Sequence, residues 1–233
     1  MSFTFKQFII EQDQCAMKVG TDGVLLGAWA KGGKKILDIG TGTGLIALMM
    51  AQRFSHSTIY AIEIDPTASS QAKSNFISSP FASRLFLKNI SLQKYVNLEN
   101  VFNFDAIVSN PPYFENSIKS KSLARTQARH TDYLPFRDLF RCAYILLTDI
   151  GHFSIIVPFD KKSTIEAEAI VCGFFISKIV YIKSKKIKRT KRLLIDFVKY
   201  PISLESSTEF IYQDNGIDKS NWFTNLTKDF YLK

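Results

Sequence analysis

A glycine-rich turn is the feature of this 233-residue sequence that most constrains its fold. Residues 35–39 (KILDI) form a short apolar run typical of a buried strand, and residues 45–54 (LIALMMAQRF) carry apolar side chains at helical spacing. Gly40, Gly42 and Gly44 lie between them. A strand that passes through such a turn into a helix begins a strand–helix–strand unit, so the sequence predicts an α/β fold around a parallel sheet.

The same alternation continues along the chain. Apolar runs predict further strands at 58–64, 84–88, 105–109, 152–157, 174–182 and 193–200. Helical spacing predicts helices at 68–77, with Pro66 at the helix start, and at 136–147 and 162–172. We therefore expect a seven-stranded, mostly parallel sheet.

A short basic segment joins the last two predicted strands, 174–182 and 193–200, so we expect an antiparallel hairpin at one edge of the sheet. No linker or repeat divides the chain, which predicts a single domain. Within that domain we distinguish an N-terminal segment (1–33), a core (34–200) and a C-terminal extension (201–233).

Composition excludes several classes of protein. Hydrophobic residues make up 46% of the chain, without a run of the ~20 apolar residues that would span a bilayer. The first ten residues lack the pattern of a secretory signal. Three widely separated cysteines predict reduced thiols in the cytoplasm, and no Cys or His spacing predicts a metal site. We expect a soluble, monomeric protein.

The spacing of the glycine-rich turn favours one class of cofactor. A dinucleotide site would require G-x-G-x-x-G, but here the pattern is G-x-G-x-G, with Asp38 two residues before Gly40. Glycines let a ligand approach the backbone, and the following helix offers free N–H groups. S-adenosylmethionine has no pyrophosphate, and its α-amino group suits an acid beside the turn. A tight turn without a ligand is the alternative.

Two further strand ends carry candidate cofactor ligands. Glu63 lies at the end of the 58–64 strand, next to its last residue, where a carboxylate can accept from both ribose hydroxyls of an adenosine. Asp65 is the alternative, although its place before Pro66 predicts a helix cap. Asn89 follows the 84–88 strand, and its side-chain oxygen could accept from the adenine amino group; it could equally be a turn residue.

The tetrapeptide Asn110-Pro111-Pro112-Tyr113 predicts the chemistry, because it follows the 105–109 strand and ligands bind beyond the carboxyl ends of parallel strands. The Asn110 side-chain oxygen and the Pro111 carbonyl can accept the two N–H bonds of a planar amino group and draw its nitrogen toward tetrahedral geometry. Pro111 and Pro112 restrict the backbone, and Tyr113 offers a ring on which a flipped base can stack. These residues predict methyl transfer to N6 of adenine. A plain Pro-Pro strand terminator is the alternative.

The chain carries a formal charge of +9, which makes nucleic acid a candidate partner; a basic enzyme without a polymeric substrate is the alternative. Seven of the ten residues 183–192 are cationic, and Lys185, Lys186, Lys188 and Arg189 are the predicted contacts to RNA phosphates. A solvated charged hairpin would show the same composition.

A second basic cluster follows the tetrapeptide. Arg125, Arg129 and His130 are expected to touch the nucleotides that flank the target base.

Together these motifs resemble class I S-adenosylmethionine-dependent methyltransferases, which have a Rossmann-like fold. Residues 17–30 (MKVGTDGVLLGAWA) and 125–130 (RTQARH) resemble more specifically the tRNA1(Val) (adenine(37)-N6)-methyltransferase family. The resemblance covers most of the chain. It implies a cytoplasmic enzyme that methylates the adenosine 3′ of the anticodon in a tRNA. It also implies that Lys18, Thr21 and Asp22 lie near the donor pocket, whereas Asn89 departs from the aspartate usual in that family.

Three other functions remain open at this point. A protein glutamine methyltransferase could use the same tetrapeptide, since the target amide is also planar. A DNA adenine methyltransferase is possible, although no second domain for reading a duplex is evident. A catalytically silent RNA-binding protein would not need the intact set of Asp38, Glu63 and Asn110.

Overall fold

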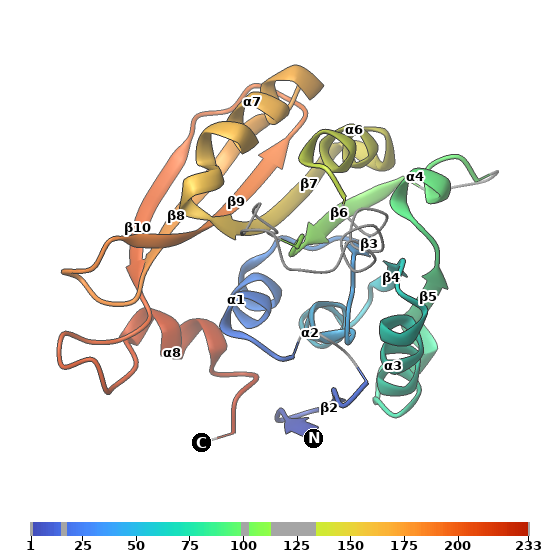
Figure 1. Cartoon of the computed structure of the whole chain (residues 1–233), viewed down its shortest axis with the longest axis horizontal. Helices are drawn as coiled ribbons and strands as arrows, with labels where there is room; N and C mark the ends of the chain where they lie inside the picture. Colours follow the sequence, from blue (N-terminus) through green and yellow to red (C-terminus); the bar gives the residue numbers. More distant parts are fainter. Residues whose placement is uncertain (1, 15–17, 99–102, 113–133, 233) are drawn as a thin grey trace, which may run out of the picture.

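The computed structural model describes residues 2–14, 18–98, 103–112 and 134–232. These residues form an eight-stranded sheet with helices on both faces, and a separate two-stranded hairpin (Figure 1). The order in the large sheet is β10-β8-β9-β7-β6-β3-β4-β5. The predicted α/β fold with a mostly parallel sheet is therefore confirmed.

Five neighbouring parallel strands form the part of the sheet that carries the motifs. They are β7 (Leu147–Pro158), β6 (Phe104–Ser109), β3 (Lys35–Ile39), β4 (Thr58–Glu63) and β5 (Leu85–Asn89). The last residues of adjacent strands are in register: Ile39 pairs with Ser109, and Glu63 pairs with Asn89. The segments after these strands therefore emerge at one edge, which we call the carboxyl edge.

The other side of the sheet differs from the prediction. β8 (Phe175–Lys183) and β9 (Thr190–Val198) form the expected antiparallel hairpin, and β9 also pairs with β7. The hairpin is not at the edge, because β10 (Glu205–Phe210) pairs in parallel with β8 outside it. The sheet has eight strands instead of seven. The sequence ESSTEF of β10 lacks apolar alternation, because this edge strand buries none of its side chains fully.

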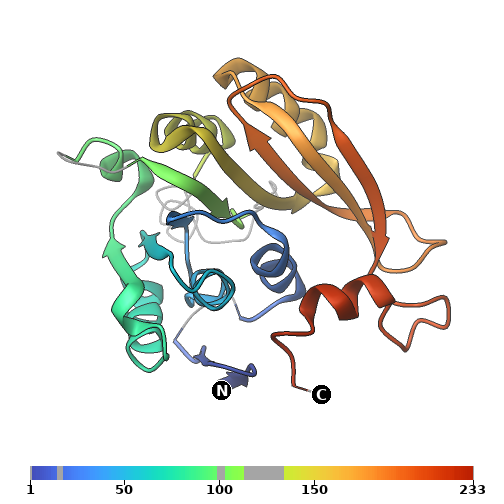
Figure 2. The same ribbon diagram turned by 180° about the vertical axis from the view of Figure 1, so that it is seen from behind.

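Helices cover the two faces of the sheet in separate groups (Figures 1 and 2). One group comprises α1 (Thr21–Trp29), α2 (Leu45–Arg53), α3 (Pro66–Ile77) and α8 (Asn221–Thr227). The other comprises α4 (Leu92–Tyr95), α6 (Phe136–Leu146) and α7 (Lys162–Cys172). Two short 3-10 helices, Ala82–Arg84 and Phe159–Lys161, precede β5 and α7. No helix in the described ranges is long and apolar enough to cross a membrane.

A close helix crossing fixes α1 beside the glycine-rich turn. α1 packs on α2, and a Cβ atom at Gly27 would lie only 2.7 Å from the Met49 sulfur. Glycine at this position therefore lets the two helices approach. Thr21 is the first residue of α1, and Leu45 is the first of α2, directly after the turn. Packing thus anchors the motif-bearing N-terminal segment to the sheet.

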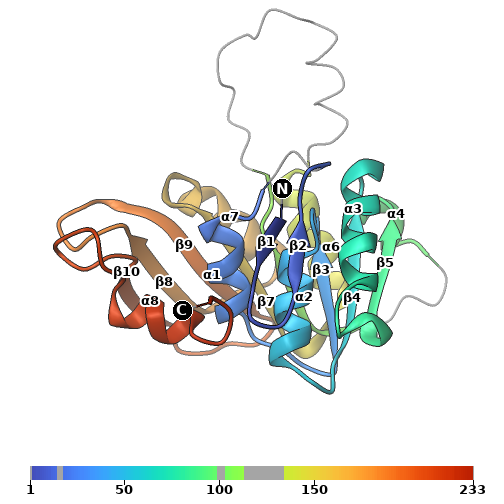
Figure 3. The ribbon, with the colours of Figure 1, turned by 90° about the horizontal axis from the view of Figure 1, so that it is seen from below.

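The two ends of the chain lie side by side below the sheet (Figure 1). β1 (Ser2–Thr4) and β2 (Ile9–Glu11) form a hairpin that lies beside α2 and α3 (Figure 3). The Lys6 amide donates to the Phe230 carbonyl at 2.8 Å, and the Phe5 and Tyr231 rings stack. These contacts and the place of β10 in the main sheet support our proposal that the chain forms one domain.

Candidate active site

The ends of β3 and β6 form the centre of the site. Ile39 and Ser109 are paired in parallel register, and the Ser109 hydroxyl donates to the Ile39 carbonyl at 3.0 Å. Asn110 follows Ser109, and Gly40 follows Ile39, so both emerge side by side at the carboxyl edge. Pro111 is buried, and Pro112 is partly buried. Tyr113, Arg125, Arg129 and His130 lie outside the described residues.

The three glycines of the glycine-rich turn adopt left-handed backbone conformations. Gly40, Gly42 and Gly44 have φ values of 70°, 57° and 86°. A Cβ atom at Gly40 or Gly42 would meet no atom of the described chain within 4 Å, whereas one at Gly44 would lie 2.5 Å from the Phe76 ring. Gly44 therefore serves packing, and the first two glycines border open space into which a ligand can approach.

The Glu63 carboxylate links the second strand end to this turn. Its Oε2 accepts from the Gly42 amide at 2.8 Å, and its Oε1 accepts from the Asp65 amide at 3.0 Å. Each carboxylate oxygen has a second lone pair, so Glu63 can still accept from two hydroxyl groups. Asp65 itself caps α3 by accepting from the Thr67 amide at 2.9 Å, as its sequence position predicts.

Asn89 is oriented by its own amide group. Its Nδ2 donates to the carbonyls of Glu63 at 2.7 Å and Ile64 at 3.1 Å. This orients the side chain, and within the described chain Oδ1 has no hydrogen-bond partner. An acceptor is thus available on an exposed side chain beside Glu63. An aspartate at this position could not donate to the two carbonyls.

Asp38 is fully buried beneath the turn. Its Oδ2 accepts from the Thr41 hydroxyl at 2.6 Å and from the Ala47 amide at 3.1 Å, while Oδ1 has no partner among the described residues. Burial raises the pKa of Asp38 from 3.8 to about 7; the two hydrogen bonds oppose this shift, and the charge of Glu63 adds to it. A cationic group near Oδ1 would favour the ionised form.

The residues of the N-terminal motif differ in what they contact. Thr21 begins α1 at the carboxyl edge, and Lys18 is exposed. The Asp22 carboxylate accepts from the Arg192 Nε at 2.7 Å, which joins α1 to β9. The sequence does not predict this ion pair, because its partners are 170 positions apart.

The basic segment forms the turn between β8 and β9. β8 runs parallel to β10 and antiparallel to β9, and Arg192 on β9 pairs with Pro158 at the end of β7. The turn therefore lies at the carboxyl edge. Its backbone is closed by the Lys188 amide, which donates to the Lys185 carbonyl at 3.0 Å, and the Lys185 ammonium packs against Gly216. Lys186, Lys188 and Arg189 are exposed.

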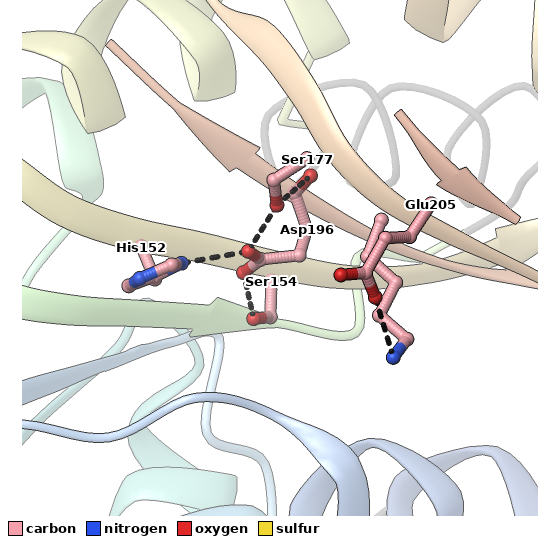
Figure 4. Close-up of polar contacts among 6 residues, drawn as sticks. His152, Ser154, Ser177, Asp196 and Glu205 are labelled. Carbon is pink, nitrogen blue, oxygen red and sulfur yellow. Dashed lines mark hydrogen bonds and ion pairs between the residues drawn. The ribbon is translucent and has the colours of Figure 1, made fainter. Parts of the chain in front are cut away.

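A buried polar cluster in the sheet was missed by the sequence analysis. Asp196 on β9 accepts hydrogen bonds from Ser154 at 2.8 Å and from Ser177, and its Oδ2 lies 2.7 Å from His152 Nδ1 (Figure 4). Strand register places Asp196 in line with Ser154 on β7 and Val108 on β6, one residue short of the end of β6. The cluster thus satisfies the hydrogen-bonding groups of a buried carboxylate inside the sheet. The described residues hold no group of three potential metal ligands.

Solved structures share this fold. A predicted O-methyltransferase from Agrobacterium tumefaciens superposes with a TM-score of 0.70 at 17% identity, covering 90% of this chain and 96% of that one. TrmN from Thermus thermophilus has a TM-score of 0.54 at 20% identity, covering 76% of this chain and 47% of that one. Residues 18–132 match the model of the methyltransferase small domain family. Fold and site thus define a Rossmann-like methyltransferase.

Curated relatives identify the family more closely. A tRNA1(Val) (adenine(37)-N6)-methyltransferase from Trichodesmium erythraeum is 46% identical, covering 99% of this chain and 98% of its own length. Another, from Parabacteroides distasonis, is 43% identical with the same coverage. The chain belongs to the tRNA1(Val) (adenine(37)-N6)-methyltransferase family.

Proposed function

We propose that the protein transfers a methyl group from S-adenosylmethionine to N6 of adenosine 37 in tRNA1(Val). The observation that carries the proposal is the register of β3 and β6, since Ile39 and Ser109 pair and are followed by Gly40 and Asn110. A donor bound over the glycine-rich turn would then lie next to the Asn110 side chain. The family to which the chain belongs supports the substrate.

The donor would be held by five features of the carboxyl edge. Glu63 would accept from the ribose hydroxyls, and Asn89 Oδ1 would accept from the adenine amino group. Asp38, with an unpartnered buried oxygen, would balance the α-amino charge. Gly40 and Gly42 leave room for the ligand against the backbone. Thr21, at the start of α1, would complete the pocket.

Asn110 and Pro111 would activate the target nitrogen. The N6 lone pair of adenine is delocalised into the ring, which makes the nitrogen planar and a poor nucleophile. Two acceptors, the Asn110 side-chain oxygen and the Pro111 carbonyl, would take its two N–H bonds and direct the lone pair away from the ring. S-adenosylmethionine supplies an electrophilic methyl group on its sulfonium. Alignment and electrostatics would then provide most of the rate.

Pro112 fixes the backbone beside these acceptors, and Tyr113 would stack on the flipped base. Arg125 and Arg129 would contact flanking nucleotides. Lys185, Lys186, Lys188 and Arg189 would bind phosphates from the same edge. We further propose that the protein acts as a monomer in the cytoplasm, where its tRNA substrate resides.

A substrate panel tests this function directly. The protein and methyl-labelled S-adenosylmethionine are incubated in separate reactions with one substrate each: unmethylated tRNA transcript, duplex DNA or a release-factor protein. We expect label in tRNA alone, with nucleoside mass spectrometry reporting N6-methyladenosine at position 37. Label in DNA or protein, or in another nucleoside of tRNA, would contradict the proposal.

A further inference from the structure

A small cavity lies at the carboxyl edge, between the first turn of α1 and the ends of β8 and β9. Its volume is about 130 Å³. This is below the ~300–1,000 Å³ of sites for drug-sized ligands, so the cavity admits a single chemical group rather than a whole nucleotide. Four of its lining residues are charged: Asp22, Lys183, Lys191 and Arg192.

The charges around this cavity favour an anion. Lys183, Lys191 and Arg192 contribute three positive charges, and Asp22 contributes one negative charge. Within the described chain, neither Lys183 nor Lys191 has an ion-pair partner. Arg192 is held by Asp22 at 2.7 Å, which fixes the direction of its guanidinium. A surplus of two positive charges therefore surrounds a small space with one oriented donor group.

The position of the cavity relates it to the candidate active site. Arg192 pairs with Pro158 on β7, and Ile155 of β7 pairs with Ser109 on β6. Two strand spacings of about 4.8 Å and three residues of about 3.3 Å separate Arg192 from Ser109, which amounts to roughly 14 Å between their Cα atoms. An RNA strand whose base reaches Asn110 can therefore extend its backbone to the cavity.

We propose that this cavity binds one backbone phosphate of the RNA substrate, near the methylated adenosine. Lys183 and Lys191 supply point charges, and the Arg192 guanidinium, held by Asp22 and by the Lys191 carbonyl, adds a third charge in a fixed place. This site differs from the exposed Lys186, Lys188 and Arg189 of the β8–β9 turn, for which the described residues supply no ion pair to fix a direction. A fixed phosphate sets the distance between the backbone and the target base. The inference rests on the proposed tRNA substrate.

The test compares two charge-matched double variants. Lys183→Gln with Lys191→Gln removes two charges from the cavity. Lys31→Gln with Lys34→Gln removes two charges at the opposite edge, before β3. For each protein, tRNA transcript binding is measured across a range of salt concentrations, and kcat and KM for tRNA are measured at low salt. Calorimetric affinity for S-adenosylmethionine reports whether the fold is intact.

We expect the cavity variant to lower the log–log salt slope by about 0.7–0.9, the value for one lost phosphate contact, with a raised KM for tRNA and nearly unchanged kcat. The control variant should match wild type. An unchanged slope and KM in the cavity variant, or equal losses in both variants, would overturn the phosphate site while leaving the methyltransferase function intact. A wild-type protein that neither binds nor methylates tRNA would overturn the proposed function and the phosphate site with it.

Discussion

The Glu63 carboxylate accepts a hydrogen bond from the Gly42 amide at 2.8 Å, so the acid at the end of β4 and the glycine-rich turn after β3 form one unit. The other carboxylate oxygen accepts from the Asp65 amide, at the cap of α3. A side chain that would bind the donor ribose therefore also holds two backbone segments in place.

Glu63→Ala is expected to weaken S-adenosylmethionine binding by at least about 100-fold. The variant loses the acceptor for the ribose hydroxyls, and hydrogen bonds to a charged group each contribute about 1.5–3 kcal/mol. Glu63→Gln keeps one acceptor oxygen and should lose less affinity. Isothermal titration calorimetry measures both values. Wild-type affinity in Glu63→Ala would refute the ribose contact.

Two glycine substitutions should separate cofactor binding from folding. Gly42 and Gly44 both have positive φ, so alanine costs about 1–2 kcal/mol of backbone strain at either site. At Gly44 the added Cβ would also meet Phe76, and Gly44→Ala should therefore show the larger loss of stability in urea unfolding. At Gly42 the Cβ would project into open space, so Gly42→Ala should fold but bind the donor poorly. Equal donor affinity in Gly42→Ala and wild type would contradict the placement of the ligand.

The raised pKa of Asp38 makes two measurable quantities depend on pH. The folded protein holds the Asp38 proton up to about pH 7, whereas the ordinary pKa is 3.8. The contribution of Asp38 to the free energy of unfolding therefore falls as pH rises from about 4 to 7, and above pH 7 it stays low. The stability difference between wild type and Asp38→Asn should change across that window, as measured by urea unfolding at several pH values. A stability difference that stays constant across this pH range would contradict the raised pKa of Asp38.

Donor binding should also release a proton from Asp38. The donor ammonium would favour the carboxylate, so about half a proton should leave at pH 7 in wild type and none in Asp38→Asn. Calorimetry in buffers of different ionisation enthalpy measures this number. Equal proton release in the two proteins would show that Asp38 does not face the ammonium.

The Asp196 cluster should matter for stability and not for catalysis. Asp196→Ala leaves the Ser154 hydroxyl without its acceptor, and Ser177 keeps only the backbone carbonyl of residue 196, at 3.1 Å. One unsatisfied buried group costs about 1–3 kcal/mol, so we expect a loss of that size in urea unfolding, with unchanged donor affinity. Glu205→Ala is the control, since its ion pair with Lys178 on the surface contributes little (Figure 4). A similar small effect of both substitutions would contradict the cluster's role.

Apolar periodicity predicts most of the core, because its strands and helices bury their apolar faces. α7 has the expected bounds, and α2, β4 and α6 each end within one residue of them. The polar strand β10 could not be predicted in this way, since it buries no apolar face.

Part of the candidate site, like part of the fold, could be predicted from the sequence, and part could not. Functional positions at a strand end, such as Glu63, or just after one, such as Asn110, follow from the general rule for parallel sheets. The hydrogen bonds that the Asn89 amide donates, and the Asp22–Arg192 ion pair, depend on which atoms meet in three dimensions. Residues distant in sequence gave no signal of these contacts.

The most direct test of the account is the amount of N6-methyladenosine at position 37, quantified by mass spectrometry, in tRNA1(Val) transcript incubated with wild type or Asn110→Ala at saturating donor. We expect the wild type to methylate this position and the variant to be slower by at least about 100-fold, the cost of removing one group that stabilises a transition state. Equal methylation by the two proteins would contradict the role of Asn110, and methylation at another position would contradict the substrate.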